Sequence, residues 1–249
     1  MDFTQIIYQQ KGAVAWISLH RPEKLNALTP VMMAELRAVL TDIQSNQDCH
    51  IVVVNGSGKA WSAGVDLALF QEIKVEPGFK MHEDGVAVID MLENMPQVTI
   101  AMLNGYCFTG AMELMLGFDM IVAAEEAKIG DTHAKWGIPP KWGMTQRLLN
   151  QVGMRKAKEL SFTAEAISGI EAARIGLVNQ AVPLGELQNT VDTLITKILA
   201  NSAQTIAAVK QLYQFGNTHS LTEGITYEQE FEMQPNDKTD KLKNFKKEI

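Results

Sequence analysis

Short apolar runs recur along the first half of the chain, separated by polar and glycine-containing loops. A continuous apolar run of about four to eight residues is typical of a strand that is buried on both faces. Such strands are predicted at residues 13–19, 50–54, 96–103 and 120–124.

Helical spacing alternates with these runs. Apolar side chains recur every three or four positions between residues 31 and 43, and residues 82–94 form a second helical stretch. Thr29 and Pro30 mark the start of the first helix, because a threonine oxygen caps free amides and proline fits the first helical position. The repeated order of strand, loop and helix predicts an α/β body.

From about residue 147 the pattern becomes helical. Helical stretches are predicted at residues 146–162, 167–178, 187–200 and 203–215, before a polar, lysine-rich tail that begins at Pro235. The last third is therefore predicted to be an α-helical layer attached to the α/β body.

Composition narrows the classes of function. With 249 residues, 46% of them hydrophobic, the chain suits one main domain. The net charge of −7 argues against a nucleic-acid binder and against a polybasic membrane-surface protein. Cys49 and Cys107 lack the spacing of a zinc site or a disulfide framework. Since neither a signal peptide nor a membrane span is visible, we expect a soluble, cytoplasmic protein. The sequence also lacks the spacing of a metal-binding motif, so we expect no metal site.

The glycine-rich loop at residues 55–64, NGSGKAWSAG, partly resembles three motifs and matches none of them. The dinucleotide fingerprint fails because Trp61 occupies the third glycine position, and the phosphate-binding loop fails because alanine follows Lys59. A nucleophile elbow would place Ser62 before an Asp119 and a His133 in hydrolase order. The elbow lacks its first glycine and a strand that runs directly into the turn, so Ser62 is interpreted as structural.

Two similar loops carry the candidate chemistry. SAGVD at residues 62–66 and FTGAMEL at residues 108–114 each follow a strand-like segment, contain a glycine that permits close backbone approach, and precede a helix-like stretch. One amide from each loop could converge on a single oxygen. Such a pair stabilises negative charge that develops on a thioester or acyl oxygen.

Glu113 lies three residues after Gly110, in the apolar segment AMELML. Burial there would raise the pKa of the carboxyl group, as a general acid or base working near neutral pH requires. The alternative is a glutamate placed in the first turn of a helix, where the helix dipole favours it. The residues by themselves leave both interpretations open.

Five ordered segments resemble the crotonase, or enoyl-CoA hydratase/isomerase, superfamily. They are RPEKLNAL (21–28), GKAWSAGVDL (58–67), NGYCFTGAMELMLGFD (104–119), GIPPKWGMTQRL (137–148) and GIEAARIGLVNQAVP (169–183). The resemblance runs from about residue 12 to about residue 185. It implies the crotonase (ClpP-like) α/β spiral of strand, strand, helix units over residues 1–190. Residues 191–249 would form a C-terminal helical region that assembles a homo-oligomer, a trimer or a hexamer.

The resemblance also implies a site for an acyl-CoA thioester. The amides of Val65 and Gly110 would form the oxyanion hole. The substrate or CoA would contact residues of the same loops, and Lys24 would either meet a CoA phosphate or remain a solvated charge. The implied substrate-binding set is Lys24, Ala63, Val65, Asp66, Leu67, Ala68 and Gly110. Coenzyme A enters as part of the substrate, so no separate cofactor is expected.

Two catalytic glutamates characterise hydratases of the superfamily, and Glu113 occupies the position of the first. The second falls in a G-x-P-E segment, where this chain has His133. Imidazole can accept and donate a proton near neutral pH, so His133 could act in that place. Alternatively, His133 fills the pocket wall and bonds to backbone. Trp136 and Trp142 are interpreted as packing residues rather than as parts of an acyl pocket.

The leading hypothesis is an enoyl-CoA hydratase-like lyase that adds or removes water at the 2,3 double bond of an acyl-CoA, through an enolate held in the oxyanion hole. An enoyl-CoA isomerase is the second reading, weakened because that reaction tends to use the second glutamate. A third is an acyl-CoA hydrolase or retro-Claisen enzyme in which His133 activates water. A non-catalytic acyl-CoA binder is the fourth.

Overall fold

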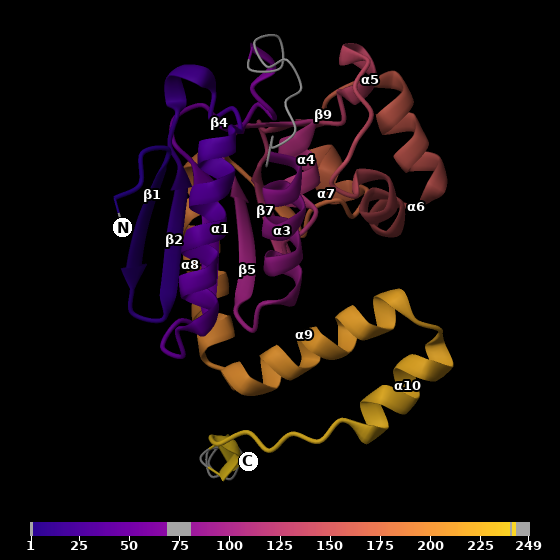
Figure 1. Cartoon of the computed structure of the whole chain (residues 1–249). Coiled ribbons are helices and arrows are strands. Elements are labelled where there is room, and N and C mark those ends of the chain that lie inside the picture. The colour runs from indigo at the N-terminus through magenta and orange to yellow at the C-terminus, as the bar shows by residue number, and fades with distance from the viewer. Residues whose placement is uncertain (1, 69–80, 240, 243–249) are drawn as a thin grey trace.

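The computed structural model describes residues 2–68, 81–239 and 241–242 (Figure 1). Its larger sheet has six strands in the order β1-β2-β3-β5-β7-β10. They are β1 (Ile6–Lys11), β2 (Val14–Leu19), β3 (Ile51–Gly56), β5 (Val98–Leu103), β7 (Met120–Ala124) and β10 (Gln180–Val182). β1 and β2 form an antiparallel hairpin, and the other neighbours are parallel.

A second, smaller sheet has the order β4-β6-β8-β9. Its strands are β4 (Ala60–Ser62), β6 (Tyr106–Phe108), β8 (Lys128–Gly130) and β9 (Ile167–Ser168). Each of β3, β5 and β7 in the large sheet is followed along the chain by a strand of the small sheet. Successive turns of the chain thus add one strand to each sheet, and the α/β spiral predicted from the sequence is confirmed.

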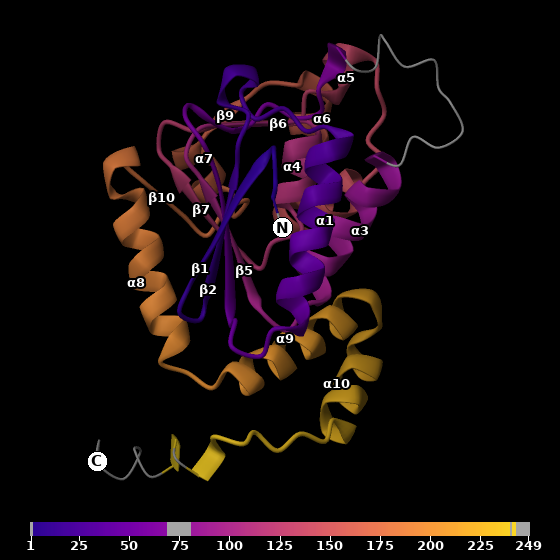
Figure 2. The same cartoon turned by 60° about the vertical axis from the view of Figure 1, so that its left-hand side comes forward.

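Helices cover both faces of the large sheet (Figure 2). α1 (Pro30–Ser45) and α3 (Met81–Asn94) lie together on one face, and α8 (Leu187–Leu199) lies on the other. α1 begins where the sequence predicts, since the Met32 N–H donates to the Thr29 Oγ1 at 3.0 Å. Its buried stripe contains Leu36, Leu40 and Ile43, which belong to the same continuous apolar core as the buried residues of β3.

The remaining helices surround the small sheet or extend from the body. They are η1 (Pro22–Lys24), α4 (Gly110–Met115), α5 (His133–Trp136), α6 (Met144–Thr163), α7 (Gly169–Arg174), η2 (Leu184–Glu186), α9 (Ala203–Thr218) and α10 (Leu221–Glu230). Figure 1 shows α9 and α10 below the body, at the side opposite to α4 and α5. None of the described helices is long and apolar enough to cross a bilayer.

Candidate active site

The small sheet brings together three loops that are far apart in the sequence. β4, β6 and β8 are parallel neighbours, with Ser62 paired to Cys107 and Phe108 paired to Gly130. Their carboxyl ends therefore lie side by side, and the residues that follow each strand meet there. The first strand leads into Val65, the second into Gly110 and Glu113, and the third into His133.

The two glycine loops are in contact. A methyl group built on Gly110 would lie 2.8 Å from the Val65 Cγ2. Gly110 opens α4, where the first amides of a helix have no partner within the helix. Within the described ranges, neither the Val65 nor the Gly110 N–H donates a hydrogen bond to another protein group. Two free amides on loops that are in contact are suited to stabilising a developing oxyanion.

The loop that carries Val65 is fixed by the segment at residues 21–28. The Leu28 N–H donates to the Gly64 carbonyl at 2.8 Å, and the Asp66 N–H donates to the Leu28 carbonyl at 2.9 Å. The Arg21 guanidinium pairs with the Asp66 carboxylate at 3.1 Å. Gly64 has a φ of 90°, and a methyl group there would lie 2.5 Å from the Phe108 carbonyl oxygen, so glycine is required.

Glu113 is buried in α4 but it is not surrounded by apolar groups alone. Its Oε1 accepts hydrogen bonds from the Trp142 N–H at 2.8 Å and from the Met144 N–H at 3.3 Å. Because these amides occupy Oε1, the other oxygen is left for a different partner. That partner is His133, whose Nε2 lies 3.4 Å from Oε2.

His133 lies between two carboxyl groups. Its Nδ1 is 2.6 Å from the Asp131 Oδ1, and its Nε2 faces Glu113. Burial disfavours the imidazolium, but the bonds to Asp131 and Glu113 outweigh it and raise the pKa of His133 to about 9. Burial likewise disfavours ionised Asp131, but the bonds from His133 outweigh it and lower the pKa of this carboxyl group. The His133 ring contacts two carboxylates. The alternative of a pocket-wall histidine predicted bonds to the backbone instead.

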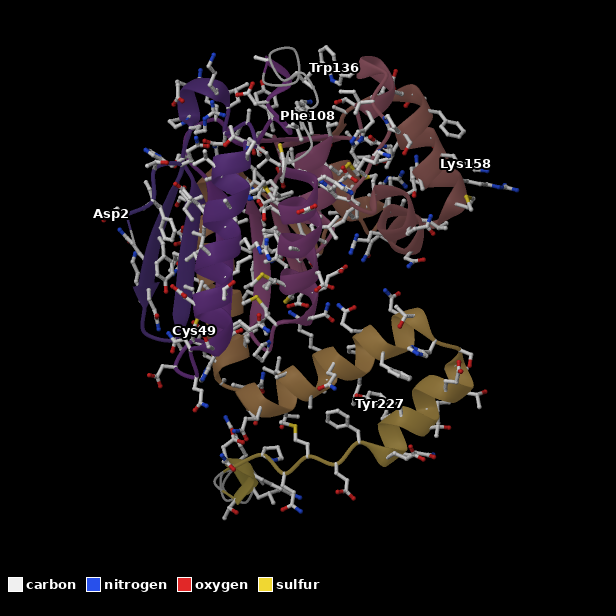
Figure 3. All side chains as sticks on the ribbon, viewed as in Figure 1. Asp2, Cys49, Phe108, Trp136, Lys158 and Tyr227 are labelled. Carbon is white, nitrogen blue, oxygen red and sulfur yellow. The ribbon has the colours of Figure 1, made fainter. Side chains whose placement is uncertain are left out.

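A cavity of about 370 Å³ opens beside these groups. Phe108 and Trp136, labelled in Figure 3, belong to its wall. The wall is otherwise mostly aliphatic, with two threonines and one lysine, and consists of Ala63, Val65, Leu67, Phe108, Thr109, Thr132, His133, Lys135, Trp136, Ile138 and Ala166. The cavity thus combines an apolar wall with His133 and the loop of the first free amide, as a pocket for an acyl group would require.

Comparison with known proteins settles the family. The sequence model of the family "Enoyl-CoA hydratase/isomerase" matches residues 9–247. The chain belongs to this family. It is 33% identical over 231 residues to the short-chain-enoyl-CoA hydratase of Clostridium acetobutylicum, an alignment that covers 92% of this chain and 88% of that protein.

Solved structures of the enoyl-CoA hydratase/isomerase family agree with the fold. An enoyl-CoA hydratase from Bacillus anthracis superposes with a TM-score of 0.94 at 31% identity, over 98% of this chain and 97% of the other. A putative enoyl-CoA hydratase from Thermobifida fusca, solved with acetoacetyl-CoA, gives a TM-score of 0.83 at 28% identity, over 90% of this chain and 92% of that one.

Three of the seven predicted substrate-binding residues line the cavity and four do not. Ala63, Val65 and Leu67 line the cavity. Lys24 and Ala68 are exposed and do not line it, and Asp66 is engaged by Arg21. Gly110 and Glu113 are buried just behind the wall, next to Val65 and His133 respectively.

Ser62 takes no part in a hydrolase triad. Its buried Oγ accepts the Gly64 N–H at 3.2 Å, and Asp119 is bonded to Thr99 and Lys210 instead. The structural interpretation of Ser62 is therefore confirmed.

The two tryptophans differ from each other. Trp142 is buried, and methyl groups built on Gly85 and Gly110 would both meet its ring, so it packs as predicted. Trp136 is 57% exposed and lines the cavity, so the packing interpretation was wrong for this residue. The neighbouring glycine, Gly137, turns the chain with a φ of 63° directly after Trp136.

The sequence analysis missed two features: Asp131, and the Arg147 contacts that support the segment whose amides bind Glu113. The Arg147 guanidinium donates to the Trp142 carbonyl at 2.8 Å and holds Glu93 through both carboxylate oxygens, at 2.5 and 2.6 Å. This pair fixes the segment whose amides hold Glu113. Asp131 had a local signal, because an aspartate two residues before a histidine can bond to that residue's amide and ring.

Proposed function

We propose that the protein is an enoyl-CoA hydratase, which adds water across the 2,3 double bond of an acyl-CoA thioester or removes it. The observation that supports this most directly is the arrangement of Glu113 Oε2 and His133 Nε2, 3.4 Å apart beside two free amides. A hydratase needs two proton-transferring groups and a site for an enolate oxygen, and this arrangement supplies all three.

Val65 and Gly110 are proposed to bind the thioester oxygen with their N–H groups. Glu113 Oε2 is the proposed base, since Oε1 is already occupied by two amides. His133 is the proposed second proton-transferring group. Its raised pKa, about 9, argues against the hydrolase reading, because imidazolium cannot take a proton from water near neutral pH.

The substrate-binding assignment extends this proposal. The loop of Ala63, Val65 and Leu67 would lie along the acyl thioester, and Lys24 would be available to a CoA phosphate from its exposed position on η1. The neighbour from Thermobifida fusca was solved with acetoacetyl-CoA, which supports a CoA thioester as the ligand.

The experiment follows the loss of conjugated absorbance with a panel of 2-enoyl-CoA thioesters, with free thiol measured in parallel. Wild type should hydrate at least one of them without releasing thiol. Glu113→Gln keeps an oxygen for the two amides, so it should fold normally and lose about 10²–10⁴-fold in kcat. Full activity in Glu113→Gln would contradict the mechanism. Thiol release without hydration would favour the hydrolase, and double-bond migration alone would favour the isomerase.

We further propose that residues 191–249 assemble the chain into a trimer or hexamer. α9 and α10 carry large apolar side chains that are exposed in the single chain, among them Tyr213 at 77% and Leu221 at 81%. Such a surface is typical of an interface. Light scattering of wild type and of Tyr213→Ser/Leu221→Ser should show a trimer or larger for the former and a smaller species for the latter. A monomeric wild type would contradict this proposal.

A further inference from the structure

Asp131 is a buried carboxylate that the mechanism above does not use. It is 2% exposed and follows the last residue of β8. Its Oδ1 accepts both the His133 backbone N–H at 3.2 Å and the ring Nδ1 at 2.6 Å. One oxygen thus fixes the start of α5 and the plane of the imidazole together.

These two hydrogen bonds to Asp131 determine which nitrogen of the His133 ring faces Glu113. A carboxylate can only accept a hydrogen bond, so Nδ1 must carry a proton. Nε2 is then directed at Glu113 Oε2, and the ring forms part of the cavity wall. The charged groups that face His133 are Glu113 from α4 and Asp131 from the end of β8. α6, also packed against α5, contributes Ser161 beside Asp131.

We infer that Asp131 is a positioning residue that keeps His133 doubly protonated, so that His133 is the acid and Glu113 the base of hydration. The inference rests on the proposed hydratase function. The raised pKa of His133, about 9, agrees with it, because both neighbouring carboxylates favour the imidazolium despite its burial.

The steps balance without any further reactant. Glu113 Oε2 takes a proton from water as the water oxygen bonds to the β-carbon, and the π electrons move to the thioester oxygen at Val65 and Gly110. The enolate then re-forms its carbonyl as the α-carbon takes the proton from His133 Nε2. Glu113 returns its proton to Nε2 across the 3.4 Å contact, which restores both groups. Dehydration follows the same path in reverse.

The same geometry explains why a histidine stands where the superfamily pattern has a glutamate. A glutamate at this position would place a third carboxyl group between Glu113 and Asp131, where the imidazolium of His133 now supplies a positive charge. Buried carboxyl groups at such short distances from one another cannot all be ionised. Asp131 and His133 therefore form a matched pair, and changing one should require changing the other.

A four-protein cycle tests this with but-2-enoyl-CoA as substrate: wild type, Asp131→Asn, His133→Glu, and both changes together. In wild type, kcat should fall above about pH 9 as the acid loses its proton. In Asp131→Asn, whose side-chain oxygen can still accept a hydrogen bond from the Nδ1–H, that limb should move down by about two pH units, and kcat at pH 8 should fall about tenfold with KM nearly unchanged. His133→Glu alone should be the least active, and Asp131→Asn should restore it about tenfold or more.

The protonation of His133 is read independently of activity by ¹⁵N NMR of labelled histidine. Both ring nitrogens should stay protonated to about pH 8 in wild type, and His133 should titrate at lower pH in Asp131→Asn. Titration of His133 near its ordinary pKa in wild type overturns the inference even if the protein hydrates its substrate. So does an unmoved alkaline limb in Asp131→Asn, or a double variant no better than His133→Glu. Absence of hydration by wild type would instead refute the proposed function, with the NMR result standing separately.

Discussion

Buried charge occurs at two opposite ends of the spiral, and the two clusters are built differently. Lys210 from α9 lies at the amino ends of β5 and β7, where its Nζ donates to Asp119 at 2.7 Å and to the carbonyls of Leu92 and Gln97 at 2.8 and 3.0 Å. His133 lies at the carboxyl end of β8, between Asp131 and Glu113. Figure 1 shows α9 and α5 on opposite sides of the body.

The pKa values of the two clusters move in opposite senses. At the Lys210 cluster burial dominates, so the pKa of Lys210 is lowered and that of Asp119 is raised, each toward its neutral form. At the His133 cluster two carboxylates face one imidazole, and their attraction outweighs the effect of burial. The pKa of His133 is therefore raised, which favours its charged form. Lys210 has one carboxylate partner, Asp119, and the pair attaches α9 to the body. His133 has two carboxylate partners, which keep its ring charged and able to donate a proton.

The largest expected effect on stability comes from breaking the first cluster. Lys210→Met leaves Asp119 buried without its cation and two carbonyls without a donor, so unfolding free energy should fall by about 3–5 kcal/mol. kcat per folded molecule should stay within about twofold, because the substitution lies far from the proton-transferring groups. Denaturant unfolding and the hydration assay measure the two. Lys210→Met/Asp119→Leu is the matched control, which should recover much of the loss. Equal instability of both variants would show that the loss does not come from the unpaired Asp119 carboxylate.

Gly110→Ala should affect activity instead. The added methyl group meets Val65 Cγ2 at 2.8 Å and the Trp142 ring at 3.2 Å, which forces the two amide-bearing loops apart. Misaligned oxyanion donors should reduce kcat by between about 10-fold and about 10³-fold, with little change in melting temperature. Gly216→Ala in α9 is a control, because a methyl group there meets no atom within 4 Å. Unchanged kcat in Gly110→Ala would remove this amide from the mechanism.

The pH dependence of stability should separate the clusters. The pKa of His133 is about 9 in the folded chain against about 6.5 in a free histidine, so its stabilising contribution is complete below pH 6.5 and disappears as pH rises through 9. Over that window wild type should lose up to about 3 kcal/mol more than His133→Gln, in which this group is absent. Chemical denaturation at several pH values measures the difference. Parallel curves for the two proteins would mean that His133 is not stabilised in its charged form.

The smallest effect is expected where charge is exposed. Arg174 and Glu171 on α7 form an ion pair at 2.6 Å, but Arg174 is exposed and Glu171 is partly exposed to solvent. Solvent and salt screen such a pair, so Arg174→Ala should leave unfolding midpoint and kcat unchanged within error. A clear loss of stability would show that a short ion pair can stabilise this protein without being buried.

The sequence pattern predicted the large sheet better than the small one. Residues 120–124 were predicted as a strand and are β7, and α1 was predicted from its apolar stripe and its Thr29 cap. The strands β4, β6 and β8 have three residues each, too few for a periodic pattern to appear. α10 was also missed, because the helix is short, its sequence contains few apolar residues and none of its residues is buried.

The site shows the same limit. The loops of Val65 and Gly110 and the position of Glu113 were found from glycine placement and family resemblance. The amides that hold Glu113 come from Trp142 and Met144, 29 and 31 residues further along the chain, where no local rule connects them. Asp131 lies only two residues before His133 in sequence, yet its role depends on Glu113 approaching the other side of the ring.

The spiral order of strands has a consequence for synthesis on the ribosome. The groups of the site are translated in the order Val65, Gly110, Glu113, His133, and the amides of Trp142 and Met144 emerge last. Until those amides arrive, the Glu113 side chain lacks the partners that hold it in α4. A nascent chain can therefore assemble most of its large sheet before its reactive carboxylate is locked in place, and catalytic competence should follow completion of the fold instead of preceding it.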